Sequence, residues 1–150
     1  MKTTFLFAVI FIFIANVNAQ SAEDSVKKSV NQLFEGMKNV DPDLIRASFA
    51  DSAVLQTIVR GADGKVAIKN ESVSAFASSI SKQTKGALDE QIQFESIKID
   101  GDLASVWTPY KFFFSGKFSH CGVNSFQLVR VKGSWKIQYL IDTRRRVGCE

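Results

Sequence analysis

From residue 89 onward, strand-like segments alternate with glycine turns, and this pattern constrains the fold more than any other feature of the chain. The segments are 89–99, 103–115, 118–131 and 135 to about 144, and the turns between them contain Asp100-Gly101, Gly116-Lys117 and Gly133. Strands joined by such short turns pair with their sequence neighbours as antiparallel partners. The sequence therefore predicts a long antiparallel meander at the C-terminal end.

A helical segment near the start of the chain carries one apolar stripe. It begins with a Ser-x-x-Asp capping pattern at Ser21, and we expect it to end near Asn39. The stripe is formed by Val26, Val30, Leu33, Phe34 and Met37. Residues at this spacing lie on one side of a helix, so the pattern indicates an amphipathic helix that packs on the sheet.

Two further helices and a hairpin lie between that helix and the meander. Asp41-Pro42 provides an N-cap followed by proline at the first helical position, which begins a short helix through Phe49. Residues 53–60 and 65–69 flank turn residues and predict a hairpin, and a third helix spans about 71–82. Helices that precede a curved sheet indicate an α+β fold in which the helices cover one face.

The first 19 residues have the order of a secretory signal peptide. Lys2 precedes an apolar run over 5–15, and Val17 and Ala19 suit the positions before a cleavage site. The run is too short to span a bilayer, so we expect no stable membrane anchor. We expect a signal peptide at 1–19, a single domain at 20–150, and a periplasmic or extracellular location.

The charge of the expected mature chain is modest. Removing residues 1–19 takes away Lys2 and no acidic residue, so the formal charge falls from +4 to +3. The one basic run, 144–146, lies near the C-terminus and is typical of a solvated end. We therefore expect no nucleic-acid partner.

The order of elements resembles that of the nuclear transport factor 2-like superfamily, most closely its SnoaL-like and lumazine-binding-like branch. Two helices, a hairpin, a third helix and a meander cover 22–144, and the last hairpin carries Gly-Ser-Trp-Lys-Ile at 133–137. The resemblance implies a cone-shaped α+β roll with a pocket between sheet and helices, which is often dimeric through the sheet. The superfamily includes enzymes and non-catalytic binding proteins, so its fold does not choose between them.

Alternation along the strands separates two faces of the sheet, if Ser115 pairs with Phe118 and Val131 pairs with Trp135. One face is nearly free of charge, and we expect it to be the concave face beneath the helices. It comprises Val106, Thr108, Tyr110, Phe112, Cys121, Val123, Ser125, Gln127, Val129, Trp135, Ile137, Tyr139 and Ile141. The other face comprises Trp107, Lys111, Phe113, His120, Asn124, Phe126, Leu128, Arg130, Lys136, Gln138, Leu140 and Asp142.

A few polar groups in an apolar cavity are typical of a small-molecule site. The residues to which we assign ligand binding are Trp107, Thr108, Tyr110, Asn124, Gln127 and Tyr139. The alternative is that such polar groups bond only to one another or to the backbone. The expected ligand is small and apolar or aromatic, and we expect no cofactor and no metal, because one histidine and two distant cysteines lack the ligand spacing of a zinc site.

The single histidine, His120, is the centre of an alternative, catalytic interpretation. Regular alternation puts His120 on the charged face, but a bulge near Gly122 would turn it inward, and a second near Asp142 would bring that carboxylate into the same cavity. His120 oriented by Asp142 would be an acid/base pair for an isomerase, dehydratase or hydrolase. A nucleophilic pair with Cys121 is disfavoured because neighbours on a strand point to opposite faces.

Two cysteines in an exported chain suggest a disulfide between Cys121 and Cys149. In the expected register Cys121 lies opposite Arg145, and Cys149 lies about 13 Å beyond at the rise of a strand. A fold-back at Gly148 would be needed to join the two sulfurs. The alternative is a buried Cys121 with a free thiol in the tail.

Three functions remain open at this point. We favour an exported, non-catalytic protein that binds a small molecule. The first alternative is an acid/base enzyme that uses His120 with Asp142. The second is an interaction module that dimerises or binds a partner through a sheet face with Trp107, Phe113 and Phe126.

Overall fold

The computed structural model describes residues 12–61 and 63–149. The expected signal peptide falls mainly on residues outside this part, and it stays a prediction. Within the described residues, no helix is both long enough and apolar enough to cross a membrane.

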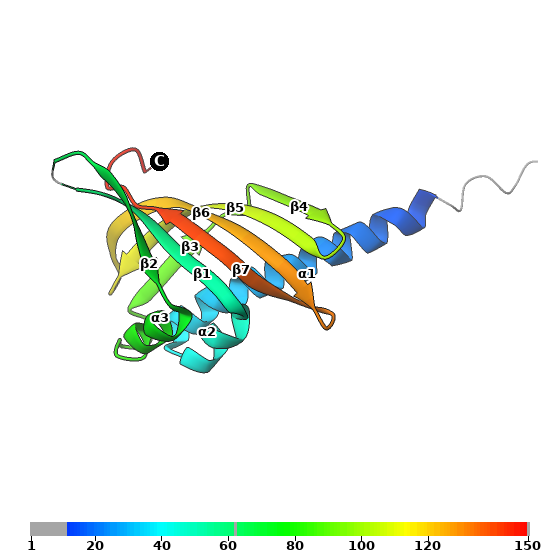
Figure 1. Cartoon of the computed structure of the whole chain (residues 1–150), viewed down its shortest axis with the longest axis horizontal. Helices are drawn as coiled ribbons and strands as arrows, with labels where there is room; N and C mark the ends of the chain where they lie inside the picture. Colours follow the sequence, from blue (N-terminus) through cyan, green and yellow to red (C-terminus); the bar gives the residue numbers. More distant parts are fainter. Residues whose placement is uncertain (1–11, 62, 150) are drawn as a thin grey trace, which may run out of the picture.

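Three helices lie against one face of a curved sheet (Figure 1). The helices are α1 (Ile12–Asn39), α2 (Pro42–Ser48) and α3 (Val73–Ile80). The strands are β1 (Phe49–Arg60), β2 (Val66–Glu71), β3 (Leu88–Ile92), β4 (Ser96–Asp100), β5 (Leu103–Phe114), β6 (Lys117–Val131) and β7 (Ser134–Thr143). The α+β roll predicted from the sequence is confirmed.

The strand order in the sheet is β2-β1-β7-β6-β5-β3, and β4 also pairs with β5. All pairs are antiparallel except β1 with β7, which are parallel. The meander therefore runs from β3 to β7, and the β1–β2 hairpin extends its far edge.

The three predicted helices are present, but their boundaries differ from those expected, and the Ser21 cap is not formed. Asp41 caps α2 by accepting hydrogen bonds from the amides of Asp43 and Leu44 at 3.1 and 2.9 Å. α1 begins at Ile12 and not at Ser21, because the apolar segment before Ser21 is also helical, so the predicted N-cap at Ser21 was wrong. α2 ends at Ser48, one residue early, because Phe49 already has the extended conformation of β1.

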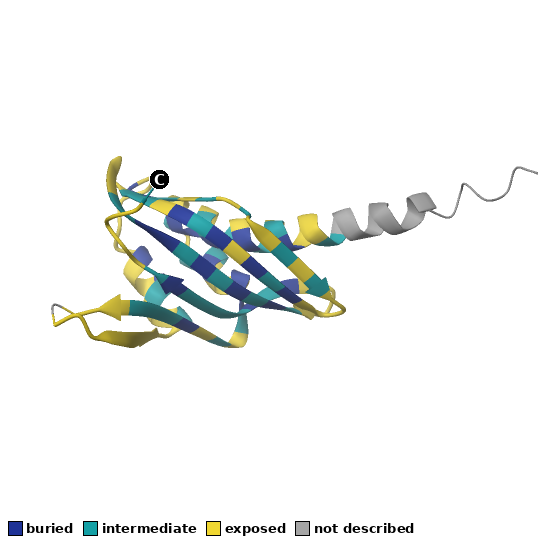
Figure 2. Ribbon diagram, turned by 90° about the horizontal axis from the view of Figure 1, so that it is seen from above, coloured by how far each residue is buried: buried dark blue, intermediate teal, exposed yellow. Residues whose placement is uncertain are grey.

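The apolar stripe of α1 packs against the inner face of the sheet. Val26, Val30 and Leu33 are fully buried, and Phe34 makes an edge-on contact with Phe126 at a centroid distance of 6.2 Å. The hydroxyl of Ser29 donates to the carbonyl of Trp135 at 2.8 Å and ties α1 to β7. Burial alternates along the central strands, as the stripes in Figure 2 show.

The segment expected as one strand at 89–99 is two strands, β3 and β4. Gln93 and Glu95, in the break, still donate backbone hydrogen bonds to the carbonyls of Pro109 and Trp107 on β5. Pro109 has no N–H to return toward that edge. The ladder of β5 is therefore interrupted at Pro109, and the edge segment splits there.

A disulfide joins Cys121 of β6 to Cys149, with the two Cα atoms 5.7 Å apart. Cys121 pairs with Arg145 by two backbone hydrogen bonds of 2.8 and 2.9 Å, as the expected register required. The fold-back is also present, because Gly148 has a φ of 64°, a conformation that glycine adopts at little cost. The bridge fastens the C-terminal tail across the outer face of β6.

Candidate functional site

A cavity of about 200 Å³ lies between the inner face of the sheet and the helices. Its apolar wall is formed by Leu33, Phe34, Met37, Leu55, Phe76, Ile80, Leu88, Phe112 and Leu140. Its polar wall is formed by Gln56, Thr57, Glu71, Glu90, Tyr110, His120, Asn124, Asp142 and Arg144. The lining is therefore amphipathic: the helices contribute apolar side chains only, and the polar side chains come from the strands and from Arg144, which follows β7.

Two bulges decide which side chains reach this cavity. On β6, Phe112 pairs with His120 but Phe113 pairs with Phe118, so Ser119 is the extra residue. On β7, Gln127 pairs with Tyr139 but Leu128 pairs with Ile137, so Gln138 is the extra residue. A single extra residue reverses the alternation of side chains beyond it.

The predicted inner face was therefore right for β5 and wrong for β6 beyond the bulge at Ser119. The β6 residues predicted to face inward, including Gln127 and Val129, lie on the outer face, whereas Asn124, Phe126 and Leu128 are the buried ones. On β7, Trp135 and Ile137 face inward as predicted, but beyond the bulge Leu140 and Asp142 face inward in place of Tyr139 and Ile141. In the last hairpin Val131 pairs with Ser134 and not with Trp135, and this difference offset the reversal on β6, so Trp135 and Ile137 were still placed correctly.

His120 and Asp142 both line the cavity, although neither bulge lies where we expected it. Gly122 is a point of close approach between strands and not a bulge. A Cβ atom at Gly122 would lie 1.8 Å from the carbonyl oxygen of Thr143 and 2.7 Å from a ring carbon of Tyr110. Glycine at this position lets β7 and the Tyr110 ring come close to β6.

Asp142 is the centre of a hydrogen-bond network on the polar wall. Its carboxylate accepts from the hydroxyl of Thr57 at 2.5 Å, from Nε of Arg144 at 2.9 Å and from the hydroxyl of Tyr110 at 3.4 Å. The Tyr110 hydroxyl also donates to the carbonyl of Thr143 at 2.9 Å. Burial, together with the charges of Glu90 and Asp142, raises the pKa of Tyr110 well above its ordinary value, so Tyr110 stays protonated.

Arg144 is the cation of this network. Burial disfavours its charge, but the hydrogen bond and the negative charge of Asp142 outweigh burial and raise the pKa of Arg144. Its terminal nitrogen also lies 3.4 Å from the hydroxyl of Thr57. Arg144 and Asp142 thus neutralise each other at the cavity wall.

Glu90 brings a second carboxyl group to the cavity. One of its oxygens accepts a hydrogen bond of 2.8 Å from the side-chain amide of Asn124, which is buried. Burial, together with the negative charge of Asp142, raises the pKa of Glu90 to about 7. The hydrogen bond from Asn124 and the positive charge of Arg144 lower it, but by less. Glu90 therefore changes its charge near neutral pH.

His120 lies between two aromatic rings. Its ring is 5.0 Å from that of Phe112 and 5.7 Å from that of Tyr110, between centroids, and its Nδ1 is 3.0 Å from the hydroxyl of Ser119. Burial and the charge of Arg144 lower the pKa of His120, so the ring is neutral at pH 7. Asp142 hydrogen bonds to Thr57, Tyr110 and Arg144 and not to His120, so the expected His120–Asp142 pair is not formed.

The other residues assigned to ligand binding occupy different places. Tyr110 and Asn124 line the cavity. Thr108 is fully buried on the inner face, and its hydroxyl has no hydrogen-bond partner in the described part of the chain. Gln127 donates to Ser105, and Tyr139 donates to Gln56 at 2.6 Å.

Trp107, Gln127 and Tyr139 lie on the outer face of the sheet, outside the cavity. Trp107 is 45% exposed. In the pairing of β5 with β6 it lies opposite Ser125, which is also on the outer face. Phe126 is fully buried under α1, so it cannot be part of the exposed interaction surface expected with Trp107 and Phe113.

Glu90, Thr57 and Arg144 belong to the site but were missed in the sequence. Glu90 is in a run of three polar residues, Asp89-Glu90-Gln91, that resembles a solvent-facing edge strand, and Arg144 is in the basic run 144–146. No local signal marks Glu90: it reaches the cavity through its pairing with Phe112, a residue predicted to face inward. Among the described residues, no group of three or more His, Cys, Asp or Glu side chains is placed to hold a metal ion.

Helices on a mainly antiparallel, curved sheet, with a cavity between the layers, form the nuclear transport factor 2-like fold. The chain belongs to the family described as "Putative lumazine-binding", whose family model matches residues 21–138. No curated protein matches the sequence.

Solved structures share the fold at low sequence identity. A nuclear transport factor 2-like protein of unknown function from Shewanella baltica is 18% identical, with a TM-score of 0.67 over 84% of this chain and 95% of that chain. A domain of unknown function with a cystatin-like fold from Nostoc punctiforme is 14% identical, with a TM-score of 0.66 over 85% and 80% of the two chains. A protein described as a "putative dehydratase" from Streptomyces avermitilis is 14% identical, with a TM-score of 0.61 over 85% and 98%.

Proposed function

We propose that this protein is exported and that its mature form binds a small, partly apolar molecule in the cavity between sheet and helices. The observation that carries the proposal is the amphipathic lining, in which apolar side chains of the helices and the sheet surround a few ordered polar groups. The volume is below the roughly 300–1,000 Å³ of drug-sized ligand sites, so the ligand is the size of one or two fused rings.

A nuclear magnetic resonance titration with naphthalene tests this proposal. We expect naphthalene to shift the backbone amide signals of cavity residues such as Phe112 and Leu140. Leu140→Trp, which fills the cavity, should abolish these shifts, because Leu140 lines it. Ile141→Trp is the matched control, since Ile141 lies on the same strand but on the outer face. Equal binding by both variants, or no shift of cavity signals, would contradict the proposal.

Lumazine itself is the second probe, because the family description names it. Lumazine is a planar bicyclic compound with polar ring atoms. Such a molecule suits a cavity whose lining combines apolar and hydrogen-bonding side chains. Its fluorescence reports binding directly. We expect Leu140→Trp to weaken binding and Ile141→Trp to leave it unchanged.

Export is tested by the N-terminus of the protein recovered from its host. Cleavage before Gln20 would give a mature chain that begins at that residue. Mass spectrometry of the secreted or periplasmic fraction measures the N-terminus, and a chain that retains residues 1–19 would refute this part of the proposal.

A second candidate function is acid/base catalysis, which the pKa of Glu90 near 7 supports. Glu90 and His120 would be the proton-transfer groups, and Asp142 would hold Tyr110 and Arg144 in place. The α-protons of 2-tetralone, a bicyclic ketone, exchange with deuterium oxide when a base removes them. Exchange that wild type accelerates and Glu90→Gln does not would establish an enzyme, whereas exchange at the buffer rate would favour binding alone.

A further inference from the structure

Glu90 and His120 each present to the cavity a polar atom that has no partner in the part of the chain that the structure describes. Glu90 uses one carboxyl oxygen for the amide of Asn124, and its second oxygen makes no hydrogen bond. His120 uses Nδ1 for Ser119, and its Nε2 makes none. The hydroxyls of Tyr110 and Thr57 are already engaged by Thr143 and Asp142. Glu90 and His120 therefore offer a ligand open polar contacts, whereas the hydroxyls of Tyr110 and Thr57 do not.

These two residues flank an aromatic side chain. Glu90 of β3 pairs with Phe112 of β5, and Phe112 pairs with His120 of β6, so the three form one row across the sheet. The rings of Phe112 and His120 are 5.0 Å apart with an interplanar angle of 39°. A flat ligand ring can pack against the rings of Phe112 and His120 while its edge reaches the free oxygen of Glu90.

The charges around Glu90 disfavour an anionic ligand. Arg144 is the one cation among the described residues that line the cavity, and it is bound to Asp142. His120 is neutral at pH 7, Tyr110 is protonated, and Glu71 adds a negative charge at the edge of the cavity. A carboxylate or phosphate would meet Glu90 and Asp142 without a free positive charge to balance it.

We propose that Glu90 recognises the basic nitrogen of a planar heteroaromatic ligand, which stacks beside Phe112 and His120. The carboxylic acid donates a hydrogen bond to a neutral ring nitrogen, and the carboxylate accepts one from a protonated nitrogen. This inference rests on the proposed function, since it names the class of ligand for the same cavity.

The two kinds of nitrogen base must respond to pH in opposite directions. A neutral base needs the protonated Glu90, so its affinity falls as the pH rises through about 7. A cationic base needs the ionised Glu90, so its affinity rises over the same range. Between about pH 6 and pH 8 each form of Glu90 changes from roughly nine-tenths to one-tenth of the population or the reverse, so each affinity changes by up to about tenfold.

Quinoline and 4-aminoquinoline are suitable probes, because they share one ring system but are neutral and cationic in this range. Naphthalene has the same shape without a nitrogen. We expect quinoline to bind the mature chain more tightly near pH 6, 4-aminoquinoline more tightly near pH 8, and naphthalene equally at both. Shifts of cavity amide signals give the affinities and the location.

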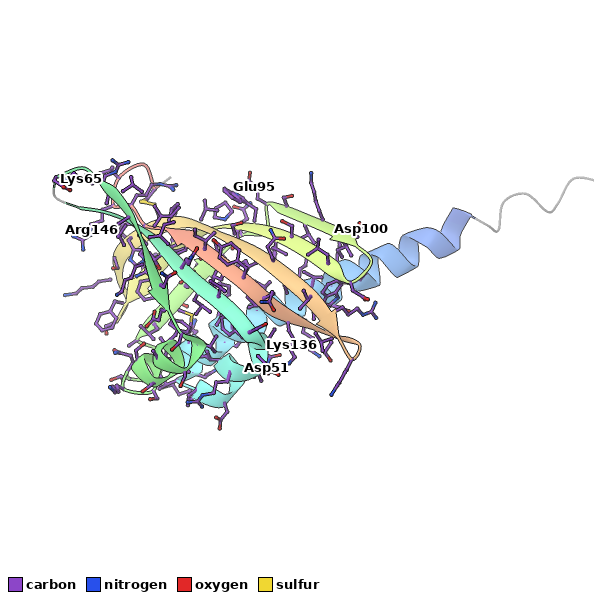
Figure 3. The ribbon with its side chains drawn as sticks, in the orientation of Figure 1. Asp51, Lys65, Glu95, Asp100, Lys136 and Arg146 are labelled. Atoms are coloured by element: carbon purple, nitrogen blue, oxygen red, sulfur yellow. A yellow bond between two sulfur atoms is a disulfide. The ribbon has the colours of Figure 1, made fainter. Side chains whose placement is uncertain are left out.

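Glu90→Gln removes the ionisable group and keeps an oxygen for Asn124, so it should abolish both pH dependences. Glu95→Gln is the matched control, because Glu95 is an exposed residue beside β4, on the side of the sheet away from α2 and α3 (Figure 3). It should behave as wild type. The opposite pH responses of wild type test the inference even if Glu90→Gln does not fold.

Each remaining outcome decides between the two proposals. If naphthalene binds and the quinolines show no pH dependence, or keep it in Glu90→Gln, the inference about Glu90 is wrong and the proposed function stands. If quinoline binds on the outer face, the inference is also wrong. If none of the three probes shifts cavity signals, the proposed function itself fails.

Discussion

The side-chain amide of Asn124 on β6 donates a hydrogen bond of 2.8 Å to the carboxyl group of Glu90 on β3, across the intervening strand β5. This bond holds a carboxyl group inside the cavity, away from bulk water. The bond favours the ionised form of Glu90, but burial disfavours that form more strongly. The result is an acidic group that carries its proton into the neutral range.

Glu90 should make the stability of the folded chain depend on pH. Its pKa is about 7 in the folded state and about 4.5 when solvated, so the folded state holds an extra proton between these values. The stabilisation is fully present below about pH 4.5 and is lost as the pH rises through about 7, up to roughly 3 kcal/mol. Urea unfolding between pH 5 and pH 8 should show wild type losing stability relative to Glu90→Gln.

Glu95→Gln is again the control for this experiment. Glu95 is exposed, so the stability of this variant should follow that of wild type at each pH. If the free energies of unfolding of wild type and Glu90→Gln changed equally with pH, the Glu90 carboxyl would be solvated in the folded state.

Gly122→Ala should destabilise the chain strongly. The added Cβ would overlap the carbonyl oxygen of Thr143, which is backbone and can move only if β7 moves. Overpacking of this kind costs about 1–3 kcal/mol and sometimes more. Gly61→Ala is the matched control, because its Cβ would meet a movable side-chain oxygen of Asp63, and we expect a change within about 0.5 kcal/mol. Equal urea midpoints for the two variants would refute the close approach.

The sequence predicted the elements of the fold more accurately than the faces of its sheet. Glycine turns and capping residues are local signals, and the strands from Leu103 to Thr143 lie close to where those signals put them. The bulges at Ser119 and Gln138 have no such signal, since neither residue requires an unusual backbone. Gly122, which did attract attention, serves a contact between strands that local sequence does not reveal.

The candidate site was predicted in part for the same reason. Tyr110 lies on β5, where the alternation was right, and it does line the cavity. His120, Asn124 and Asp142 reach the cavity because of the two bulges. Glu90 depends on the pairing of β3 with β5, a contact between segments about twenty residues apart whose register the turn residues alone did not determine.

Phe126→Ala tests the corrected face of β6. Phe126 is fully buried against Phe34 of α1, so its truncation should cost about 3–5 kcal/mol. Trp107→Ala is the control, because Trp107 is a large aromatic residue on the neighbouring strand that is 45% exposed on the outer face, and its loss should cost much less. If thermal or urea unfolding ranked the two variants the other way, the predicted outer position of Phe126 would be right after all.

Replacing both cysteines by serine should lower stability without removing the fold. The bridge closes a loop over a sequence separation of 28 residues, for which the loss of chain entropy predicts roughly 3–4 kcal/mol. The core cluster that contains Val26, Leu33 and Ile137 includes no residue of the C-terminal tail. The variant should therefore still fold cooperatively. A reducing agent should lower the urea midpoint of wild type to about that of the double variant and should leave the double variant unchanged. A wild-type midpoint that is insensitive to reduction would show that the tail is not fastened by Cys149.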